Sequence, residues 1–334
     1  MSNNSTCFCG GDHKIDVHAH FLPPCYTDAL AKAGMTTLDG GFPVPQWSAE
    51  AALQMMDAQG IGHAMVSLSS PATHFVSDEA KLGLVREVNA EGAALMKAHP
   101  TRFGYFATLP LPDVDAALKE IAYAFDIIGA DGVVLESNVN GIYLGHPDFA
   151  PVFDELNRRR AVVFLHPTSP ACFEAVALGR PAPMIEFPID TTRTIVDLLY
   201  SRTLQRCPDM KVIVPHGGAA LPSLIARIAA FANLPFLNPR PASEEEVFEM
   251  LEKLYYDVAL SAHPLVYAGL RRIAPISQIL FGSDWPFSPD FVVAGNIAYL
   301  SGNDEISESD RRAIAHENAT RLFPSIARMA ARKS

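Results

Sequence analysis

Residues 14–21 read KIDVHAHF, and this stretch decides how the rest of the chain is interpreted. Its apolar residues alternate with Asp16, His18 and His20, and a period of two predicts a β-strand that carries these three side chains on one face. Side chains two apart on a strand lie roughly 6 to 7 Å apart at the backbone. Two imidazoles at that spacing can both reach one divalent cation. A surface strand with two solvated histidines is the alternative, and further ligands along the chain decide between the two.

Size and composition limit the class of protein. The 334 residues fit a single α/β barrel, and 49% of them are hydrophobic, which is enough to fill a large core. The net charge of −11 and the lack of a basic run argue against nucleic acid or a membrane surface as a partner. The chain shows no apolar run as long as a membrane span and no signal-peptide pattern. Its five scattered cysteines are typical of free thiols, so we expect a cytoplasmic protein.

Short β-rich runs alternate with helical runs along the whole chain, which is the pattern of a parallel sheet with crossover helices. The β-rich runs are residues 14–21, 63–69, 103–109, 132–137, 161–167, 211–217, 254–261 and 278–286. The expected helices are residues 49–59, 77–99, 113–128, 147–159, 191–206 and 219–232.

Eight such units close most simply into a (β/α)8 TIM barrel, and an open doubly wound sheet is the competitor. No GxGxxG follows the first strand and no P-loop motif occurs, which weakens the nucleotide-binding form of that competitor. We predict one barrel domain over residues 14–334, preceded by a disordered tail at residues 1–13. A further amphipathic helix follows the eighth strand.

Three connections are longer than usual: residues 22–48, 168–190 and 233–245. The first two leave the C-terminal ends of predicted strands, where barrel active sites are built. We expect them to be loop insertions over that face that form pocket walls or a lid, the alternative being plain surface insertions.

Histidine or aspartate stands at the ends of four predicted strands. The first strand ends in His18 and His20, the fifth in His166 (VVFLHP), the sixth in His216 (VIVPHGG) and the eighth in Asp284 (ILFGSDWP). In a barrel these tips face one cavity, and the first and eighth strands are neighbours. Five such groups are hard to explain as separate structural residues, so the sequence predicts a metal site.

This order of ligands resembles the amidohydrolase superfamily over essentially the whole chain. The segments IDVHAHFLP, PVPQWS, VSLSSP, FLHP, PHGGAALPSLIARI and GSDWPF are similar to the branch typified by aminocarboxymuconate semialdehyde decarboxylase. Within it, HFLPP and GFPVPQWSAEAALQMMDAQGI are most similar to 6-methylsalicylate decarboxylases. The resemblance therefore implies a metal-dependent carboxy-lyase.

The resemblance also implies a ligand set. Binuclear members usually place a carboxylated lysine or a bridging acid at the end of the fourth strand, which here reads GVVLESN with Glu136 and no lysine. We expect one divalent metal ion, zinc first and manganese second, held by His18, His20, His166 and Asp284. Asp284 is also expected to be the proton donor. In this route His216 would orient or deprotonate the substrate phenol. In the other route that the resemblance implies, His216 would help to form a metal hydroxide that attacks the substrate before CO2 leaves, and the sequence does not choose between the two.

Five further residues are candidates for substrate binding. The resemblance implies that Arg227 reaches a neighbouring subunit's pocket to bind a carboxylate, which would make a homodimer the functional unit; a solvated surface arginine is the alternative. Phe21, Trp47 and Phe287 could stack on a planar substrate, or simply pack in the core. His74 could line the pocket. No arginine stands near Trp47, which favours a monocarboxylic substrate.

The implied reaction is the non-oxidative release of CO2 from a hydroxylated aromatic acid, with 6-methylsalicylate to 3-methylphenol (m-cresol) as the first candidate. A metal-dependent hydrolase of a lactone or amide on the same barrel is the alternative. A non-catalytic barrel that binds a ligand is the third. Released CO2 separates the first two hypotheses, and metal content tests the last.

Overall fold

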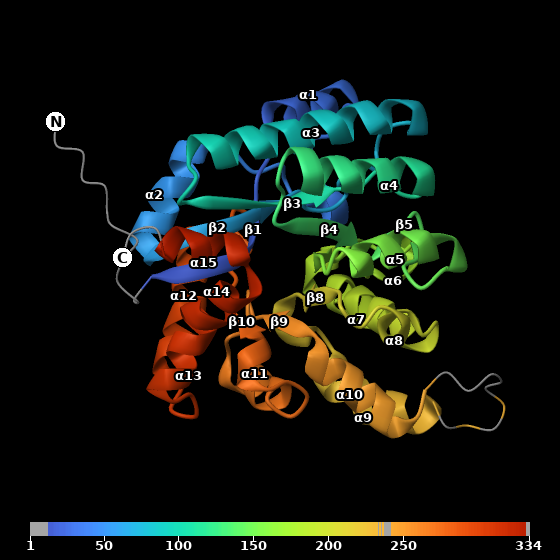
Figure 1. Cartoon of the computed structure of the whole chain (residues 1–334), viewed down its shortest axis with the longest axis vertical. Coiled ribbons are helices and arrows are strands. Elements are labelled where there is room, and N and C mark those ends of the chain that lie inside the picture. The colour runs from blue at the N-terminus through green and yellow to red at the C-terminus, as the bar shows by residue number, and fades with distance from the viewer. Residues whose placement is uncertain (1–12, 233, 235, 237–241, 332–334) are drawn as a thin grey trace.

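The computed structural model describes residues 13–232, 234, 236 and 242–331, and its centre is a ring of parallel strands (Figure 1). The strands follow one another around the ring in the order β1 (Lys14–His20), β2 (Ile61–Ser67), β3 (Phe103–Thr108), β4 (Gly132–Glu136), β7 (Val162–His166), β8 (Lys211–Val214), β9 (Tyr255–Asp257) and β10 (Ile279–Leu280). The expected tail lies outside the described residues except for residue 13, as does much of the expected loop 233–245.

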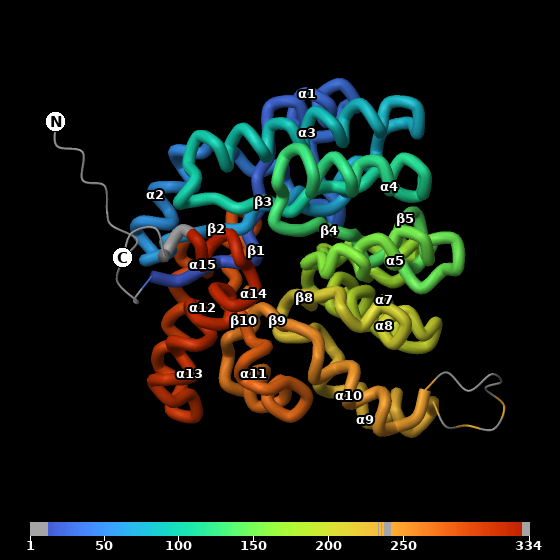
Figure 2. Tube along the Cα trace, viewed as in Figure 1, coloured from blue at the N-terminus to red at the C-terminus, as the bar shows by residue number. Residues whose placement is uncertain are grey.

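Backbone hydrogen bonds close the ring between its first strand and the chain after β10. Val17 donates to the carbonyl of Phe281 at 3.0 Å, and Asp284 donates to the carbonyl of His18 at 2.7 Å. Figure 2 shows β1 close to β10 and α14, which lie near the other end of the chain. The predicted (β/α)8 barrel is confirmed.

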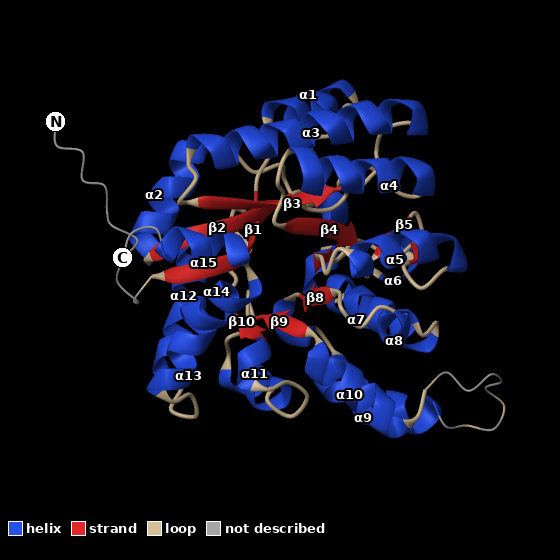
Figure 3. Cartoon of the chain, viewed as in Figure 1, coloured by secondary structure: helices blue, strands red, loops and turns tan. Residues whose placement is uncertain are grey.

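Helices cover the outside of the ring (Figure 3). The longer ones are α1 (Pro24–Lys32), α2 (Ala49–Gln59), α3 (Asp78–Ala98), α4 (Val114–Ala122), α5 (Ala150–Arg158), α7 (Glu186–Tyr200), α9 (Leu221–Ala232), α10 (Glu244–Lys253), α12 (Asp290–Gly302) and α15 (Pro324–Ala331). Shorter ones are α6 (Phe173–Val176), α8 (Thr203–Arg206), α11 (Pro264–Leu270), α13 (Glu308–Arg312) and α14 (Asn318–Leu322). None of the helices in the described part of the chain combines the length and the apolar character that a membrane crossing requires.

Local sequence signals account for several helix starts. Ser48, Ser77 and Asp113 each accept the backbone N–H three residues on, as N-caps of α2, α3 and α4 do. The single helix expected over residues 191–206 is wrong. It is split into α7 and α8 because Arg202 adopts a left-handed backbone with φ of 62°.

The first strand departs from simple alternation. Ile15 and Val17 belong to the apolar cluster inside the barrel, whereas Ala19 and Phe21 pack in the outer cluster beneath the helices. The pairing of β1 with β2 shifts register between Asp16 and Ala19. A bulge of this kind re-aims side chains, and here it directs both histidines of HAH inward.

The two long loops meet over the C-terminal ends of the strands. The 3-10 turn η1 (Asp39–Gly41) belongs to the loop after β1, and η4 (Ala182–Met184) belongs to the loop after β7. A Cβ on Gly40 would lie 2.7 Å from the Cβ of Ala182, and its φ of 70° suits glycine. The two insertions are therefore in direct contact above the barrel.

Candidate active site

The five side chains predicted at strand ends lie together at the C-terminal face. His20 Nε2 and His18 Nε2 lie 3.1 and 3.4 Å from Asp284 Oδ1, and His216 Nε2 lies 3.5 Å from Asp284 Oδ2. One nitrogen from each of His18, His20 and His166 can be chosen so that all lie within 4.8 Å of one another. Ligand atoms of His18, His216 and Asp284 meet the same criterion.

These residues fit a divalent metal ion. His18 Nε2 is fully buried, and no hydrogen bond within the described residues satisfies it. A buried nitrogen without a partner is costly, and a metal ion would remove that cost. Three imidazoles and one carboxylate are a ligand set that both zinc and manganese accept.

The electrostatics favour a cation at the same point. Burial disfavours the charged form of His18, yet the carboxylates of Asp257 and Asp284 outweigh it and raise the pKa of His18 to about 10. Burial lowers the pKa of His20, and burial together with His20 and His18 lowers the pKa of His166 well below its usual range. Burial also opposes the charge on Asp284, but the adjacent His18 and histidine hydrogen bonds hold its pKa well below normal. In metal-free protein His20 and His166 are thus neutral and Asp284 is ionised, whereas His18 holds a proton that a metal ion would displace.

Asp257, at the end of β9, is a site residue that the sequence analysis missed. Its Oδ2 lies 3.0 Å from His18 Nδ1, and both side chains are completely buried. Its Oδ1 accepts the backbone N–H groups of His216 and Ala259 at 3.2 and 2.9 Å. One carboxylate thus orients a predicted ligand and the backbone of a predicted catalytic residue.

The other two histidines also have partners behind them. His20 Nδ1 lies 3.3 Å from the carbonyl oxygen of Ser67. His166 Nε2 lies 3.3 Å from Ser69 Oγ, and its Nδ1 lies 3.5 Å from Glu136 Oε2. Glu136 therefore stands behind His166, and it belongs to neither metal-holding group found among the described residues.

Asp16 ties the first strand to the loop that carries Asp284. Its Oδ1 accepts the N–H groups of His18 and Ser283, each at 3.0 Å. Burial raises the pKa of Asp16 to about 7, against the effect of these hydrogen bonds.

The two predicted catalytic residues have left-handed backbones. His216 has φ of 56° and Asp284 has φ of 60°. Such conformations cost non-glycine residues of order 1 to 3 kcal/mol and cluster at functional sites, where the surrounding structure holds them. Here the N–H of Asp284 donates to His18 and the N–H of His216 donates to Asp257.

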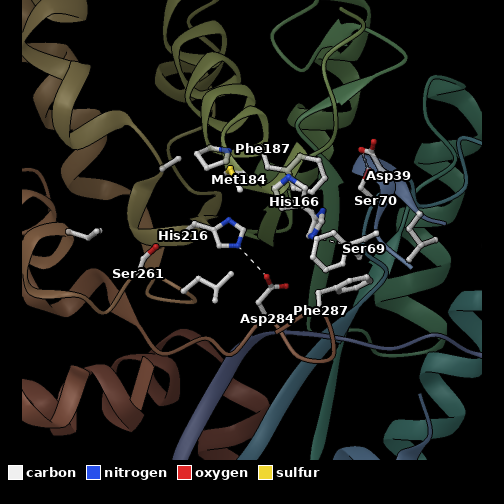
Figure 4. Close-up of a pocket in the computed structure, with 17 residues that line it drawn as sticks. Asp39, Ser69, Ser70, His166, Met184, Phe187, His216, Ser261, Asp284 and Phe287 are labelled. Atoms are coloured by element: carbon white, nitrogen blue, oxygen red, sulfur yellow. Dashed lines mark hydrogen bonds and ion pairs between the residues drawn. The ribbon is translucent and has the colours of Figure 1, made fainter. Parts of the chain in front are cut away.

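A pocket of about 330 Å³ opens above the cluster (Figure 4). His166, His216 and Asp284 lie at its base, and both long loops contribute to its walls. Most of its lining is apolar: Leu38, Phe42, Pro183, Met184, Phe187, Pro188, Ala219, Leu260, Val266 and Phe287. Its size and character suit one small aromatic molecule.

The predicted substrate residues occupy different positions. Phe287 lines the pocket, and its ring centroid lies 5.3 Å from that of His20. Phe21 is buried beside Trp47, with ring centroids 6.0 Å apart, and neither is in the pocket lining. His74 lines a separate cavity of about 20 Å³ together with Glu136.

Arg227 is exposed on α9, with its guanidinium 4.6 Å from the ring centre of Phe231. It does not line the pocket of its own chain.

Residues 15–325 match the model of the Amidohydrolase family. The chain belongs to this family. The 6-methylsalicylic acid decarboxylase of Penicillium expansum is 37% identical over 317 residues, which cover 93% of this chain and 96% of the relative. Decarboxylase yanB of Aspergillus niger is 38% identical over 328 residues, covering 93% and 87%. The resemblance to the decarboxylase branch is thus confirmed.

Solved structures agree on the barrel. The crystal structure of an amidohydrolase II superimposes with a TM-score of 0.86 at 33% identity, over 92% of this chain and 99% of that chain. A dihydroxybenzoic acid decarboxylase from Polaromonas, solved with bound manganese and 2-nitroresorcinol, has a TM-score of 0.78 at 22% identity over 94% and 97%. The second likeness shows the fold alone.

Proposed function

We propose that the protein is a metal-dependent decarboxylase of a hydroxylated aromatic acid, with 6-methylsalicylate as the first candidate and 3-methylphenol as its product. The observation that carries the proposal is the five-residue cluster at the base of an apolar pocket of about 330 Å³. The relatives named above include a 6-methylsalicylic acid decarboxylase, which supports the reaction and the substrate class.

In this proposal His18, His20, His166 and Asp284 hold one divalent ion, zinc in the first instance and manganese in the second. When bound, such an ion would hold the substrate carboxylate and stabilise negative charge. The contact between Asp257 and His18 Nδ1 leaves Nε2 of that ring to face the metal site.

His216 and Asp284 carry the proton in the proposed reaction. His216 takes the phenol proton and passes it to Asp284, since His216 Nε2 lies 3.5 Å from Asp284 Oδ2. Asp284 delivers the proton to the ring carbon that bears the carboxylate. The bond to the carboxylate then breaks, its electron pair restores the aromatic ring, and CO2 leaves. The product phenolate takes a proton from water.

The aromatic side chains would position the ring. Phe287 would contact the substrate directly, because it lines the pocket beside His20. Phe21 and Trp47 would act from behind the wall by packing on each other. His74 would influence the substrate only indirectly, through Glu136, because both residues line a small cavity separate from the pocket.

A homodimer in the cytoplasm completes the proposal. The exposure of Arg227 leaves its guanidinium available to a second copy, where it would bind the substrate carboxylate. Cys25, Cys172 and Cys207 are free thiols, as is usual in a reducing compartment.

Release of CO2 by metal-loaded protein tests the reaction. The panel is 6-methylsalicylate, salicylate, 2,6-dihydroxybenzoate and a simple lactone, with metal analysis of the same sample. We expect CO2 from the phenolic acids and 3-methylphenol from 6-methylsalicylate. Opening of the lactone without any CO2 would support the hydrolase alternative instead.

A further inference from the structure

One charged side chain in the pocket lining is neither a proposed metal ligand nor a proposed catalytic group. This residue is Asp39, in the loop after β1. In Figure 4 it lies beside Ser70, across the pocket from His216. None of the described residues that line the pocket is lysine or arginine.

The structure holds the Asp39 carboxylate firmly in place. Its Oδ2 accepts the backbone N–H of Ser169 at 2.6 Å and lies 2.7 and 2.9 Å from the hydroxyls of Ser70 and Thr168, which donate to it. These donors come from the loops after β2 and β7. Next to it, Gly40 packs against Ala182. Two other loops, those after β2 and β7, thus hold Asp39 and fix the position of its carboxylate in the pocket wall.

The charge of the site balances a single carboxylate. The metal cluster by itself, with three neutral imidazoles, one carboxylate and a divalent ion, carries one positive charge, which one substrate carboxylate neutralises. The carboxylate of Asp39 adds a negative charge to the pocket beyond this balance. A second acid group on the ring would find no lining lysine or arginine of this chain, and it would share a small, mostly apolar pocket with Asp39. Like charges brought together in such a site strongly disfavour binding.

We propose that Asp39 determines the substrate class, by excluding aromatic acids with a second acid group and so favouring monocarboxylic acids with apolar substituents. This inference rests on the proposed function, because it assumes that the pocket binds an aromatic acid on the cluster.

The test compares Asp39→Asn with Asp39→Ala in the metal-loaded protein. The asparagine keeps an oxygen for the three donors and removes the charge, whereas the alanine removes both. Dissociation constants for 6-methylsalicylate and 2-hydroxyisophthalate are measured by calorimetry, and kcat/KM is measured for each acid. Asp148→Asn, which removes an exposed charge, is the matched control.

We expect Asp39→Asn to shift the preference toward the dicarboxylic acid by about tenfold or more, and Asp148→Asn to leave the preference unchanged. An unchanged preference in Asp39→Asn would overturn the proposal. So would a shift seen only in Asp39→Ala, because the loop contacts rather than the charge would then be responsible. If Arg227→Gln alone abolished the preference between the two acids, Arg227 rather than Asp39 would determine the substrate class, and the proposal would be contradicted.

The two proposals fail in different ways. If neither acid releases CO2 but both bind, the decarboxylase proposal fails while the ratio of dissociation constants still tests Asp39. If CO2 is released and the ratio does not respond to the charge at position 39, only the specificity proposal fails.

Discussion

Two histidines on opposite sides of the cluster are each backed by a carboxyl group, and the two pairs differ. His18 Nδ1 and Asp257 Oδ2 are 3.0 Å apart, within hydrogen-bonding distance. His166 Nδ1 and Glu136 Oε2 are 3.5 Å apart, and neither atom has a hydrogen-bond partner within the described residues. We call His18 and Asp257, which are hydrogen-bonded, the closed pair. We call His166 and Glu136, which are not, the open pair.

The surroundings of the two carboxyl groups explain the difference. Asp257 receives two backbone N–H groups in addition to the ring of His18, so its charge is well solvated by the protein. Glu136 has no such donors, and burial, with a contribution from Asp39, raises its pKa well above the usual range. A carboxyl group behind a histidine therefore supports that ligand only as far as other donors stabilise its charge.

Removal of a ligand should have the largest effect. His166→Ala should lose metal and activity together, because the open Glu136 cannot replace the lost nitrogen. His216→Ala should keep most of its metal and lose about 10² to 10⁴-fold in turnover, as expected for a general acid–base group. Metal content and CO2 release, measured on the same samples, separate the two variants. Full activity in either variant would remove that residue from the assignment.

The closed pair comes next. Asp257→Asn should weaken metal affinity by about 10 to 100-fold, which is the usual effect of removing the group that orients a ligand histidine. Competition with a chelator of known affinity measures the change. Asp131→Asn, at the N-terminal end of the barrel, is the control and should bind metal normally. If Asp257→Asn also binds normally, the contact with His18 does not support the metal site.

The open pair should matter less. Glu136→Gln should change metal affinity by less than about tenfold, because the carboxyl group makes no hydrogen bond to His166 that the substitution would break. The same chelator competition ranks it directly against Asp257→Asn. Equal losses in the two variants would show that Glu136 closes on His166 once metal is bound.

The barrel could be predicted from the sequence because buried parallel strands are short and apolar. Each of the eight expected runs overlaps a strand of the ring. The last two expected runs, residues 254–261 and 278–286, are longer than β9 and β10. Beyond Leu280 the backbone makes irregular hydrogen bonds to β1, including the one from Asp284 to His18, instead of continuing as a strand. The pattern of hydrophobic residues does not predict where the regular strand ends.

The candidate ligands could be predicted because each is a polar residue that ends an apolar run. Asp257 does not give this signal, because it stands inside the expected run 254–261, in LYYDVAL, and its role depends on contact with His18, 239 residues away. The inward direction of His18 and His20 depends on the register shift after Asp16, which alternation alone does not predict. Asp39 lies in an irregular loop, and only the folded contacts of three loops place it in the pocket.

The smallest effect, and the sharpest test of the open pair, concerns the stability of metal-free protein. The pKa of Glu136 is above its ordinary value of 4.5 when folded, so the folded state binds the extra proton and stability falls as pH rises above about 4.5. Glu136→Gln has no proton to lose. Its free energy of unfolding should therefore exceed that of the native protein by about 1 kcal/mol at pH 8, with a smaller difference at pH 5.

Urea unfolding of chelator-treated protein at the two pH values measures this difference. Asp257→Asn should be less stable than the native protein at pH 8 in the same assay, because it breaks a buried hydrogen-bonded group. If the free energy of unfolding falls in Asp257→Asn and rises in Glu136→Gln, then the carboxyl group of Asp257 stabilises the fold and that of Glu136 destabilises it. A loss of stability in both would mean that Glu136 has a buried partner in solution, and the two histidines would then be supported alike.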